Sequence, residues 1–130
     1  MSDKLKIVVV DDSEFTRHTT SQILTANGHN VVAQFSNATE TIRFSHDGDA
    51  DLYIIDVVMP EISGTELAKH ITDNSLEPVN IIMVSSLDTE DIIIESISNG
   101  AIDFIKKPFV EIDLLQSVNK VRCNITSKGL

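Results

Sequence analysis

Five short runs rich in Ile and Val alternate along the chain with five segments in which apolar residues recur at helical spacing. The apolar runs predict β-strands at residues 5–10, 31–35, 52–55, 80–84 and 101–105. The segments that follow them predict helices at 14–27, 38–47, 64–74, 89–99 and 111–122. Because the strand runs are apolar throughout, instead of at every second position, we expect both faces of the sheet to be buried.

Strict alternation of strand and helix predicts an α/β fold with a doubly wound parallel sheet, since right-handed crossovers place helices on both of its faces. Short polar side chains stand before four helices as candidate N-caps: Ser13, Asn37, Ser63 and Asp88. Glycines stand where three helices should end: Gly28, Gly48 and Gly100.

The length of 130 residues suits one domain. We expect that domain at residues 1–124, followed by a short C-terminal tail at 125–130. Twenty acidic side chains against ten Lys and Arg give a formal charge of -10. Such a charge repels the phosphates of nucleic acids and anionic membrane surfaces, so we expect no direct binding of nucleic acid.

The apolar run at residues 5–10 is too short for a signal peptide, and no segment approaches the ~20 apolar residues of a membrane span. These features predict a cytoplasmic protein without membrane insertion. Cys123 has no internal disulfide partner, and its place on the last helical pattern predicts a half-buried packing residue. Four histidines without metal-ligand spacing are predicted at the surface: His18, His29, His46 and His70.

Short polar groups follow four of the predicted strands. Asp11 and Asp12 follow the first strand, Asp56 the third, Ser85 the fourth and Lys107 the fifth. Ligands of open parallel sheets bind beyond the carboxyl ends of the strands, so we expect these groups to share one edge. Carboxylates about 4 Å apart repel each other by about 4 kcal/mol at an effective dielectric constant of 20. A hard divalent cation such as Mg²⁺ offsets that repulsion.

The chemistry of this edge suits phosphoryl transfer. Asp56 lies within an apolar segment, which holds its carboxylate rigidly as a nucleophile toward phosphorus. Lys107 and Ser85 are candidates for neutralising and orienting the phosphoryl oxygens. The alternative is that the acids merely solvate loops or cap helices, that Lys107 is a solvated charge and that Ser85 is a turn residue.

The motifs DD at 11–12, DVVMP at 56–60, VSS at 84–86 and KKPF at 106–109 closely resemble those of the response-regulator receiver domain family, in its single-domain, CheY-like form. The likeness extends from residue 4 to about 121. It implies a five-stranded parallel sheet in the order 2-1-3-4-5 with five helices, as in flavodoxin. It also implies a cis peptide bond between Lys107 and Pro108.

Positions that match the family's motifs inherit expected roles. Asp56 corresponds to the phosphoacceptor, and Lys107 to the lysine that contacts the phosphoryl group. Asp12 corresponds to a direct Mg²⁺ ligand and Asp11 to an acid that acts mainly through metal-bound water. Asp56 and the backbone carbonyl of Val58 would complete the protein ligands.

The resemblance also implies a switch. Ser85 corresponds to the switch hydroxyl and Phe104 to the switch aromatic, although Phe104 lacks a phenolic hydroxyl and could respond only by packing; it could also be an ordinary core residue. Val58 and Leu87 stand two residues after Asp56 and Ser85, at positions that influence the lifetime of the phosphorylated form. Both are apolar, which predicts slow self-hydrolysis.

A candidate partner surface lies on the fourth predicted helix. Consecutive isoleucines at 92–94 sweep about 200° of a helix, so they cannot all face the sheet. Ile93 and Ile97, one turn apart, are the expected exposed stripe. The alternative is a helix that is simply deeply buried.

Taken with the resemblance, the sequence predicts a stand-alone response regulator of two-component signalling. It would accept a phosphoryl group from a sensor histidine kinase or a phosphotransfer protein and switch its binding to a downstream effector protein. It would act as a monomer or a weak phosphorylation-dependent dimer, and catalyse only its own phosphorylation and slow dephosphorylation.

Two other functions remain open from the sequence. One is a constitutive interaction adaptor whose site is unused. The other is an aspartate-nucleophile phosphohydrolase of the haloacid dehalogenase type. That second class requires an Asp-x-Asp motif, whereas Ser13 and Glu14 follow the acid pair here.

Overall fold

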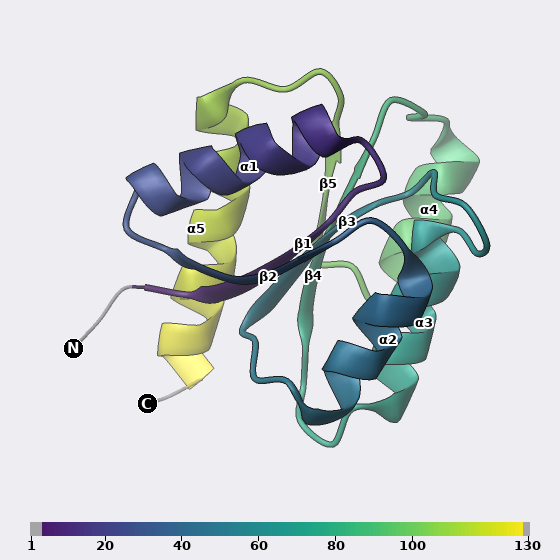
Figure 1. Cartoon of the computed structure of the whole chain (residues 1–130), viewed down its shortest axis with the longest axis horizontal. Helices are drawn as coiled ribbons and strands as arrows, with labels where there is room; N and C mark the ends of the chain where they lie inside the picture. The colour runs from purple at the N-terminus through teal and green to yellow at the C-terminus, as the bar shows by residue number, and fades with distance from the viewer. Residues whose placement is uncertain (1–3, 129–130) are drawn as a thin grey trace.

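The computed structural model describes residues 4–128, in which five strands and five helices alternate (Figure 1). The elements are β1 (Lys6–Val10), α1 (Glu14–Ala26), β2 (Asn30–Phe35), α2 (Ala38–Asp47), β3 (Leu52–Asp56), α3 (Gly64–Asn74), β4 (Asn80–Ser85), α4 (Glu90–Ser98), β5 (Asp103–Lys106) and α5 (Glu111–Lys128). No helix in this described range is long and apolar enough to cross a membrane.

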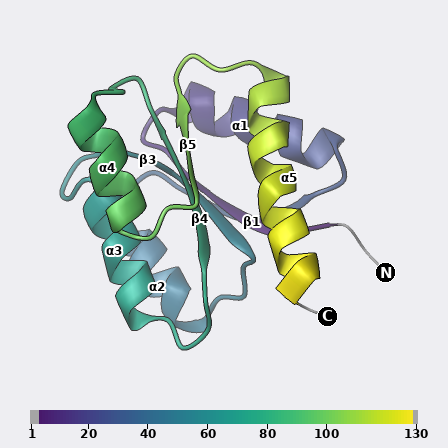
Figure 2. The ribbon, with the colours of Figure 1, turned by 180° about the vertical axis from the view of Figure 1, so that it is seen from behind.

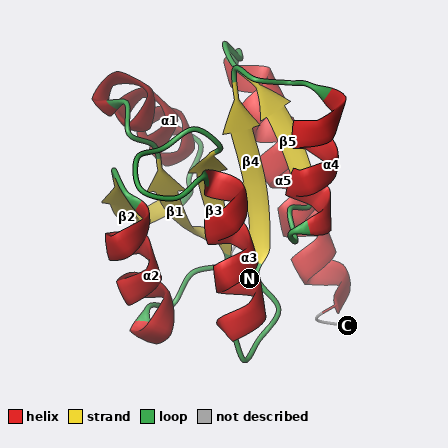
Figure 3. Ribbon diagram, turned by 90° about the vertical axis from the view of Figure 1, so that its right-hand side faces the viewer, coloured by secondary structure: helices red, strands yellow, loops and turns green. Residues whose placement is uncertain are grey.

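The five strands form one parallel sheet in the order β2-β1-β3-β4-β5. Helices α1 and α5 cover one face of this sheet, as Figure 2 shows from behind. Helices α2, α3 and α4 cover the other face (Figure 3). The predicted α/β fold and its strand order are therefore confirmed.

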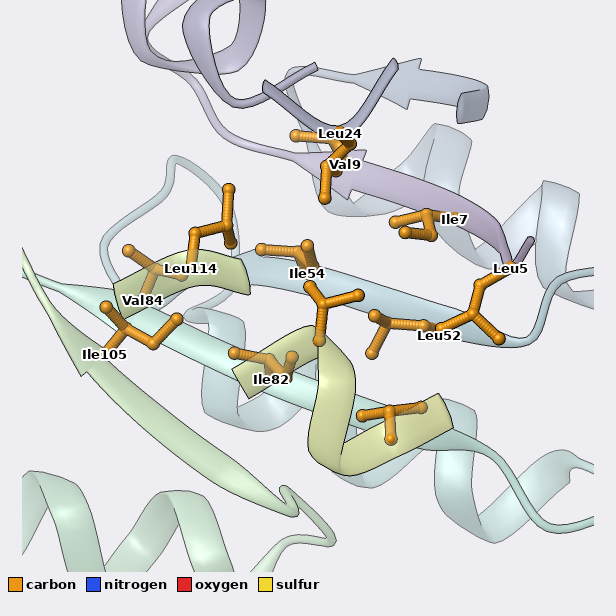
Figure 4. Packing of buried hydrophobic residues seen from close by; sticks show 12 residues of the cluster. Leu5, Ile7, Val9, Leu24, Leu52, Ile54, Ile82, Val84, Ile105 and Leu114 are labelled. Atoms are coloured by element: carbon orange, nitrogen blue, oxygen red, sulfur yellow. The ribbon is translucent and has the colours of Figure 1, made fainter. Parts of the chain in front are cut away.

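The sheet separates two apolar cores. On one face, Ile7 and Val9 of β1 pack with Leu24 of α1 and Leu114 of α5 (Figure 4). On the other face, Val8 packs with residues of α2 and α3. Each fully buried aliphatic side chain of this kind stabilises the fold by about 1.5–3 kcal/mol. Burial on both faces confirms the prediction for the central strands, whereas no residue of the edge strand β2 is fully buried.

Helix starts follow the predicted capping chemistry at three positions. The side chains of Ser13, Asn37 and Ser63 accept hydrogen bonds from backbone N–H groups three residues later. The prediction for the fourth helix is wrong: Thr89 is the N-cap of α4, and Asp88 instead pairs with Lys106 at 3.3 Å.

The last helix is longer than predicted. It continues to Lys128, and Ile125 packs against the core on the side of α1 and α5. The expected tail at 125–130 is therefore helical through residue 128, and residues 129 and 130 lie outside the described part. The predicted half-burial of Cys123 is wrong, because its side chain is exposed on this helix.

Two of the four histidines are not fully exposed. His29 is half-buried, and its Nδ1 accepts a hydrogen bond from the backbone N–H of Leu5 at 3.1 Å. His70 is also half-buried and lies edge-on to His46, with ring centroids 6.5 Å apart. Of the four histidines, only His18 and His46 are exposed as predicted.

Helix α4 is attached to α3 largely by polar contacts. The hydroxyl of the buried Thr65 donates to the carboxylate of Glu95, and the backbone carbonyl of Thr65 accepts from the side-chain amide of Asn99 at 2.9 Å. Ser96 is the one fully buried residue of α4. Ile92 adds a partly buried apolar contact to the core.

Candidate phosphoacceptor and metal site

The carboxyl ends of four strands bring the predicted polar groups to one edge of the sheet. Asp11 directly follows β1, Asp56 and Ser85 are the last residues of β3 and β4, and Lys107 directly follows β5. Backbone pairing fixes these ends in register, since the N–H of Lys107 donates to the carbonyl of Ser85 at 2.8 Å. The predicted shared edge is confirmed. The Lys107–Pro108 peptide bond is cis, as the resemblance implied.

Three carboxylates converge at this edge. Ligand oxygens of Asp11, Asp12 and Asp56 all lie within 4.8 Å of one another. Asp11 and Asp56 are buried, whereas Asp12 is exposed and leaves the cluster open to solvent on one side. The convergence predicted from the strand ends is therefore confirmed, and the cluster carries three like charges in a partly dehydrated place.

Lys107 is the counter-charge within this cluster. Its Nζ lies 2.8 Å from Oδ2 of Asp11 and 3.4 Å from Oδ2 of Asp56. Burial acts to lower the pKa of Lys107, but its hydrogen bond with Asp11 and the charge of Asp56 outweigh burial and raise that pKa. The ammonium is thus held in its charged form between two carboxylates.

Asp56 is the most perturbed acid of the site. Burial first, and the charge of Asp11 second, raise the pKa of Asp56 from 3.8 to about 6, although Lys107 and a backbone hydrogen bond from Val58 act in the opposite direction. An acid that is both buried and beside another acid is costly to ionise. Strong perturbation of this kind is typical of functional carboxylates.

Ser85 and Phe104 lie near the site in different environments. Ser85 is fully buried, and its Oγ accepts a hydrogen bond from the backbone N–H of Leu87 at 2.9 Å. Phe104 is half-buried and packs against the core beneath α2 and α3. Val58 and Leu87 are about half exposed, at 50% and 48%. Their predicted effect on phosphoryl lifetime stays a prediction.

The exposed isoleucines of α4 differ from the predicted stripe. Ile97 is 49% exposed, as expected, but its exposed neighbour is Ile94, at 54%. Ile93 is half-buried, because α4 is rotated so that Ile92 and Ile93 lie nearer the sheet. The expectation of a stripe formed by Ile93 and Ile97 is corrected to Ile94 and Ile97. The alternative of a deeply buried helix is wrong, since Ser96 alone is fully buried there.

Two residues that support the site were not singled out from the sequence. A Cβ at Gly64 would lie 2.1 Å from the carbonyl oxygen of Asp56, so only glycine lets α3 begin this close to the end of β3. The guanidinium of Arg17 donates to the backbone carbonyl of Asp11 at 2.6 Å. A glycine just after a helix cap hints at a close approach, whereas no local pattern reveals the contact of Arg17.

The acid cluster fits a magnesium ion by its chemistry. Mg²⁺ prefers hard oxygen ligands, takes one or two carboxylates and keeps several waters. Three carboxylates against one ammonium leave a local excess of two negative charges, which a divalent cation balances. Asp12 lies at the open side of the cluster, where an ion with its remaining water shell has access to the carboxylates.

Comparison with known proteins agrees with this geometry. A model of the response regulator receiver domain matches residues 7–119. The chain is 35% identical over 115 residues to the chemotaxis protein CheY of Bacillus subtilis (strain 168), covering 88% of this chain and 95% of that protein. It is 32% identical to CheY of Thermotoga maritima over 117 residues, covering 89% and 96% of the two chains.

Solved structures give the same result. The CheX-CheY-BeF3-Mg²⁺ complex from Borrelia burgdorferi contains a chain that superposes with a TM-score of 0.83 and 29% identity, over 89% of this chain and 87% of that one. A CheY-like receiver domain protein from Methanospirillum hungatei superposes with a TM-score of 0.87 and 25% identity, over 96% and 98%. With both the sequence match and the superposed folds spanning nearly all of its length, the chain belongs to the response regulator receiver domain family.

Proposed function

We propose that this response regulator accepts a phosphoryl group on Asp56 from a histidine kinase or a phosphotransfer protein, and that phosphorylation changes its affinity for a downstream protein. The observation that carries the proposal is the buried Asp56 carboxylate, which shares the Lys107 ammonium with a second buried acid, Asp11. The match to the receiver family over residues 7–119 supports it. Nothing observed favours an unused site or a phosphohydrolase.

The positions of the side chains support a direct transfer step. A carboxylate oxygen of Asp56 attacks phosphorus, a P–O bond forms and the bond to the donor's imidazole nitrogen breaks, so that an acyl phosphate results and the donor takes up a proton. Mg²⁺, when bound, supplies positive charge to the phosphoryl oxygens. Asp11, Asp12 and Asp56, with the backbone carbonyl of Val58, would hold that ion.

Lys107 and Ser85 would receive the phosphoryl group. The Lys107 ammonium lies close enough to both buried acids to shift from a carboxylate to a phosphoryl oxygen. The Ser85 hydroxyl accepts from Leu87, which leaves its own proton free to donate to a phosphoryl oxygen. Movement of Ser85 would make room for Phe104 to repack, and so bias the equilibrium between two states.

Two exposed apolar regions suit the proposed protein partners. Phe15, which is 81% exposed at the start of α1, lies beside a cavity of about 360 Å³ that Lys107 also lines. A phosphoryl donor has to approach over this edge to reach Asp56. Ile94 and Ile97 on α4 are the candidate surface for the downstream protein, or for a weak dimer of the phosphorylated form.

We expect the protein to catalyse only its own phosphorylation and a slow dephosphorylation. Neither Val58 nor Leu87 offers a group that would orient an attacking water, so hydrolysis of the acyl phosphate should be slow and turnover of small phosphate esters absent. We place this activity in the cytoplasm, where histidine kinases present their phosphorylated domains.

The test is phosphorylation by acetyl phosphate with Mg²⁺, read as the intact mass. We expect one added phosphoryl group on the wild type and none on Asp56→Asn. An exposed acid on α2 supplies the matched control, because Asp47→Asn should be modified like the wild type. An adduct that persists in Asp56→Asn, or no adduct on well-folded wild type, would overturn the proposal. Turnover of p-nitrophenyl phosphate would favour a phosphohydrolase instead.

A further inference from the structure

Asp12 is the acid of the cluster that no neighbouring side chain holds. It is exposed, and its carboxylate has no hydrogen bond to the described part of the chain. By contrast, Asp11 receives hydrogen bonds on both carboxylate oxygens, from the N–H of Ser13 at 2.8 Å and from Lys107 at 2.8 Å. The direction of the Asp12 side chain therefore depends on the backbone that carries it.

Both peptide units that flank Asp12 are fixed. The unit after it ends in the N–H of Ser13, which the Asp11 carboxylate holds. The unit before it contains the carbonyl oxygen of Asp11, and this oxygen accepts from a guanidinium nitrogen of Arg17 at 2.6 Å. With both peptide planes held, the Cα–Cβ bond of Asp12 is fixed in direction. A carboxylate oxygen of Asp12 lies within 4.8 Å of ligand oxygens of Asp11 and Asp56.

The backbone of Arg17 is itself fixed by hydrogen bonds. Its backbone N–H donates to the carbonyl of Ser13 at 2.9 Å, and its own carbonyl accepts from the hydroxyl of the buried Ser21 at 2.8 Å. The side chain thus extends from a rigid turn of α1 back to the end of β1. A charged donor forms a stronger hydrogen bond to a carbonyl than a neutral one does.

We propose that Arg17 is a positioning residue that aims Asp12 into the metal site through the carbonyl of Asp11. The inference rests on the proposed function of that site. Charge alone predicts the opposite result. A guanidinium near a cation site repels the cation, so removing its charge should tighten Mg²⁺ binding, whereas removing a residue that positions Asp12 should weaken it.

The first measurement is the Mg²⁺ dissociation constant by calorimetry. Loss of a group that orients a metal ligand typically weakens metal binding 10–100-fold, so we expect at least a tenfold rise in Arg17→Met. Arg17→Lys keeps the charge and a single donor, and should lie between Arg17→Met and the wild type. The exposed Arg43 on α2 supplies the matched control, and Arg43→Met should bind Mg²⁺ like the wild type.

A double-mutant cycle with Asp12→Asn shows whether Arg17 acts through Asp12. We expect Arg17→Met to have no further effect on Mg²⁺ binding in the Asp12→Asn background. In the metal-free protein, NMR amide signals of Asp12 and Ser13 should shift in Arg17→Met, while those of residues 72–74 at the C-terminal end of α3 stay unchanged, which also shows that the variant is folded.

Equal or tighter Mg²⁺ binding by Arg17→Met would overturn the inference, as would additive effects in the cycle. Such results would leave the proposed function intact if the wild type still takes a phosphoryl group on Asp56. Failure of the proposed function has a different signature, because the wild type itself would then neither bind Mg²⁺ nor form the adduct.

Discussion

Replacing Asp56 with Asn should stabilise the metal-free protein at neutral pH. The pKa of Asp56 is raised from 3.8 to about 6 by burial and by Asp11, so the folded state binds this proton more tightly than the unfolded state does. Ionisation of Asp56 therefore opposes folding. A shift of about two units corresponds to roughly 3 kcal/mol at pH 7, and this is the upper limit of the gain in unfolding free energy.

The stability difference between Asp56→Asn and the wild type should depend on pH. Below pH 3.8 the carboxyl is protonated in both states, and the wild type carries no penalty. The penalty grows between 3.8 and about 6 and is constant above that pH. We therefore expect the stability gap between Asp56→Asn and the wild type to be largest at pH 7 and to close as the pH falls toward 4.

Urea denaturation in EDTA, followed by far-ultraviolet circular dichroism, measures this gap; the chain has no tryptophan to report by fluorescence. With a slope of roughly 1–3 kcal/mol per molar urea, a gain of about 2 kcal/mol moves the midpoint by about 1 M. Asp47→Asn on the surface should change stability by no more than about 0.5 kcal/mol. Destabilisation by Asp56→Asn at pH 7, or a gain equal at both pH values, would refute the reasoning. Added Mg²⁺ should narrow the gap, because it binds the folded wild type more tightly than the variant.

Three further changes test other parts of the structure. Gly64→Ala places a Cβ within 2.1 Å of the carbonyl of Asp56, so we expect a loss of at least about 2 kcal/mol of unfolding free energy and weaker Mg²⁺ binding; unchanged stability would contradict the close approach. Glu61→Gly relieves a left-handed backbone at φ 74°, and chemical denaturation should show a gain of up to about 1 kcal/mol. Burial, and then Arg122, lower the pKa of His29, whose neutral ring accepts from Leu5; the stabilisation is complete above pH 6.5 and is lost as the pH falls below it. Titration of stability against pH should show this loss in the wild type and not in His29→Gln.

The sequence was sufficient for features that depend on local pattern. Runs such as residues 52–55 are apolar at every position because β3 is buried on both faces, and the acids that follow such runs had to meet at one edge. The strand order needed the resemblance to a known family, since periodicity carries no information about which strands pair.

Features that depend on distant neighbours could not be predicted. Asp88 and Thr89 are equally good N-caps locally, and a residue of β5, Lys106, decides between them by pairing with Asp88. The half-burial of His70 depends on how α2 lies against α3. Likewise, the contact of Arg17 with Asp11 arises only when the first turns of α1 fold back on β1.

The polar attachment of α4 to α3 has a consequence for how signals could travel. Exchanging a hydrogen bond with a neighbouring helix for one with water changes the free energy by only about 0.5–1.5 kcal/mol, whereas withdrawing a buried aliphatic side chain costs more. Helix α4 has Ser96 as its one fully buried residue and contributes only the partly buried Ile92 to a core, so local opening of α4 disturbs little buried apolar surface. Thr65 follows Gly64, which lies against the backbone of Asp56, so the hydrogen bonds between Thr65 and α4 form a short physical connection between the proposed phosphoacceptor and the exposed isoleucines.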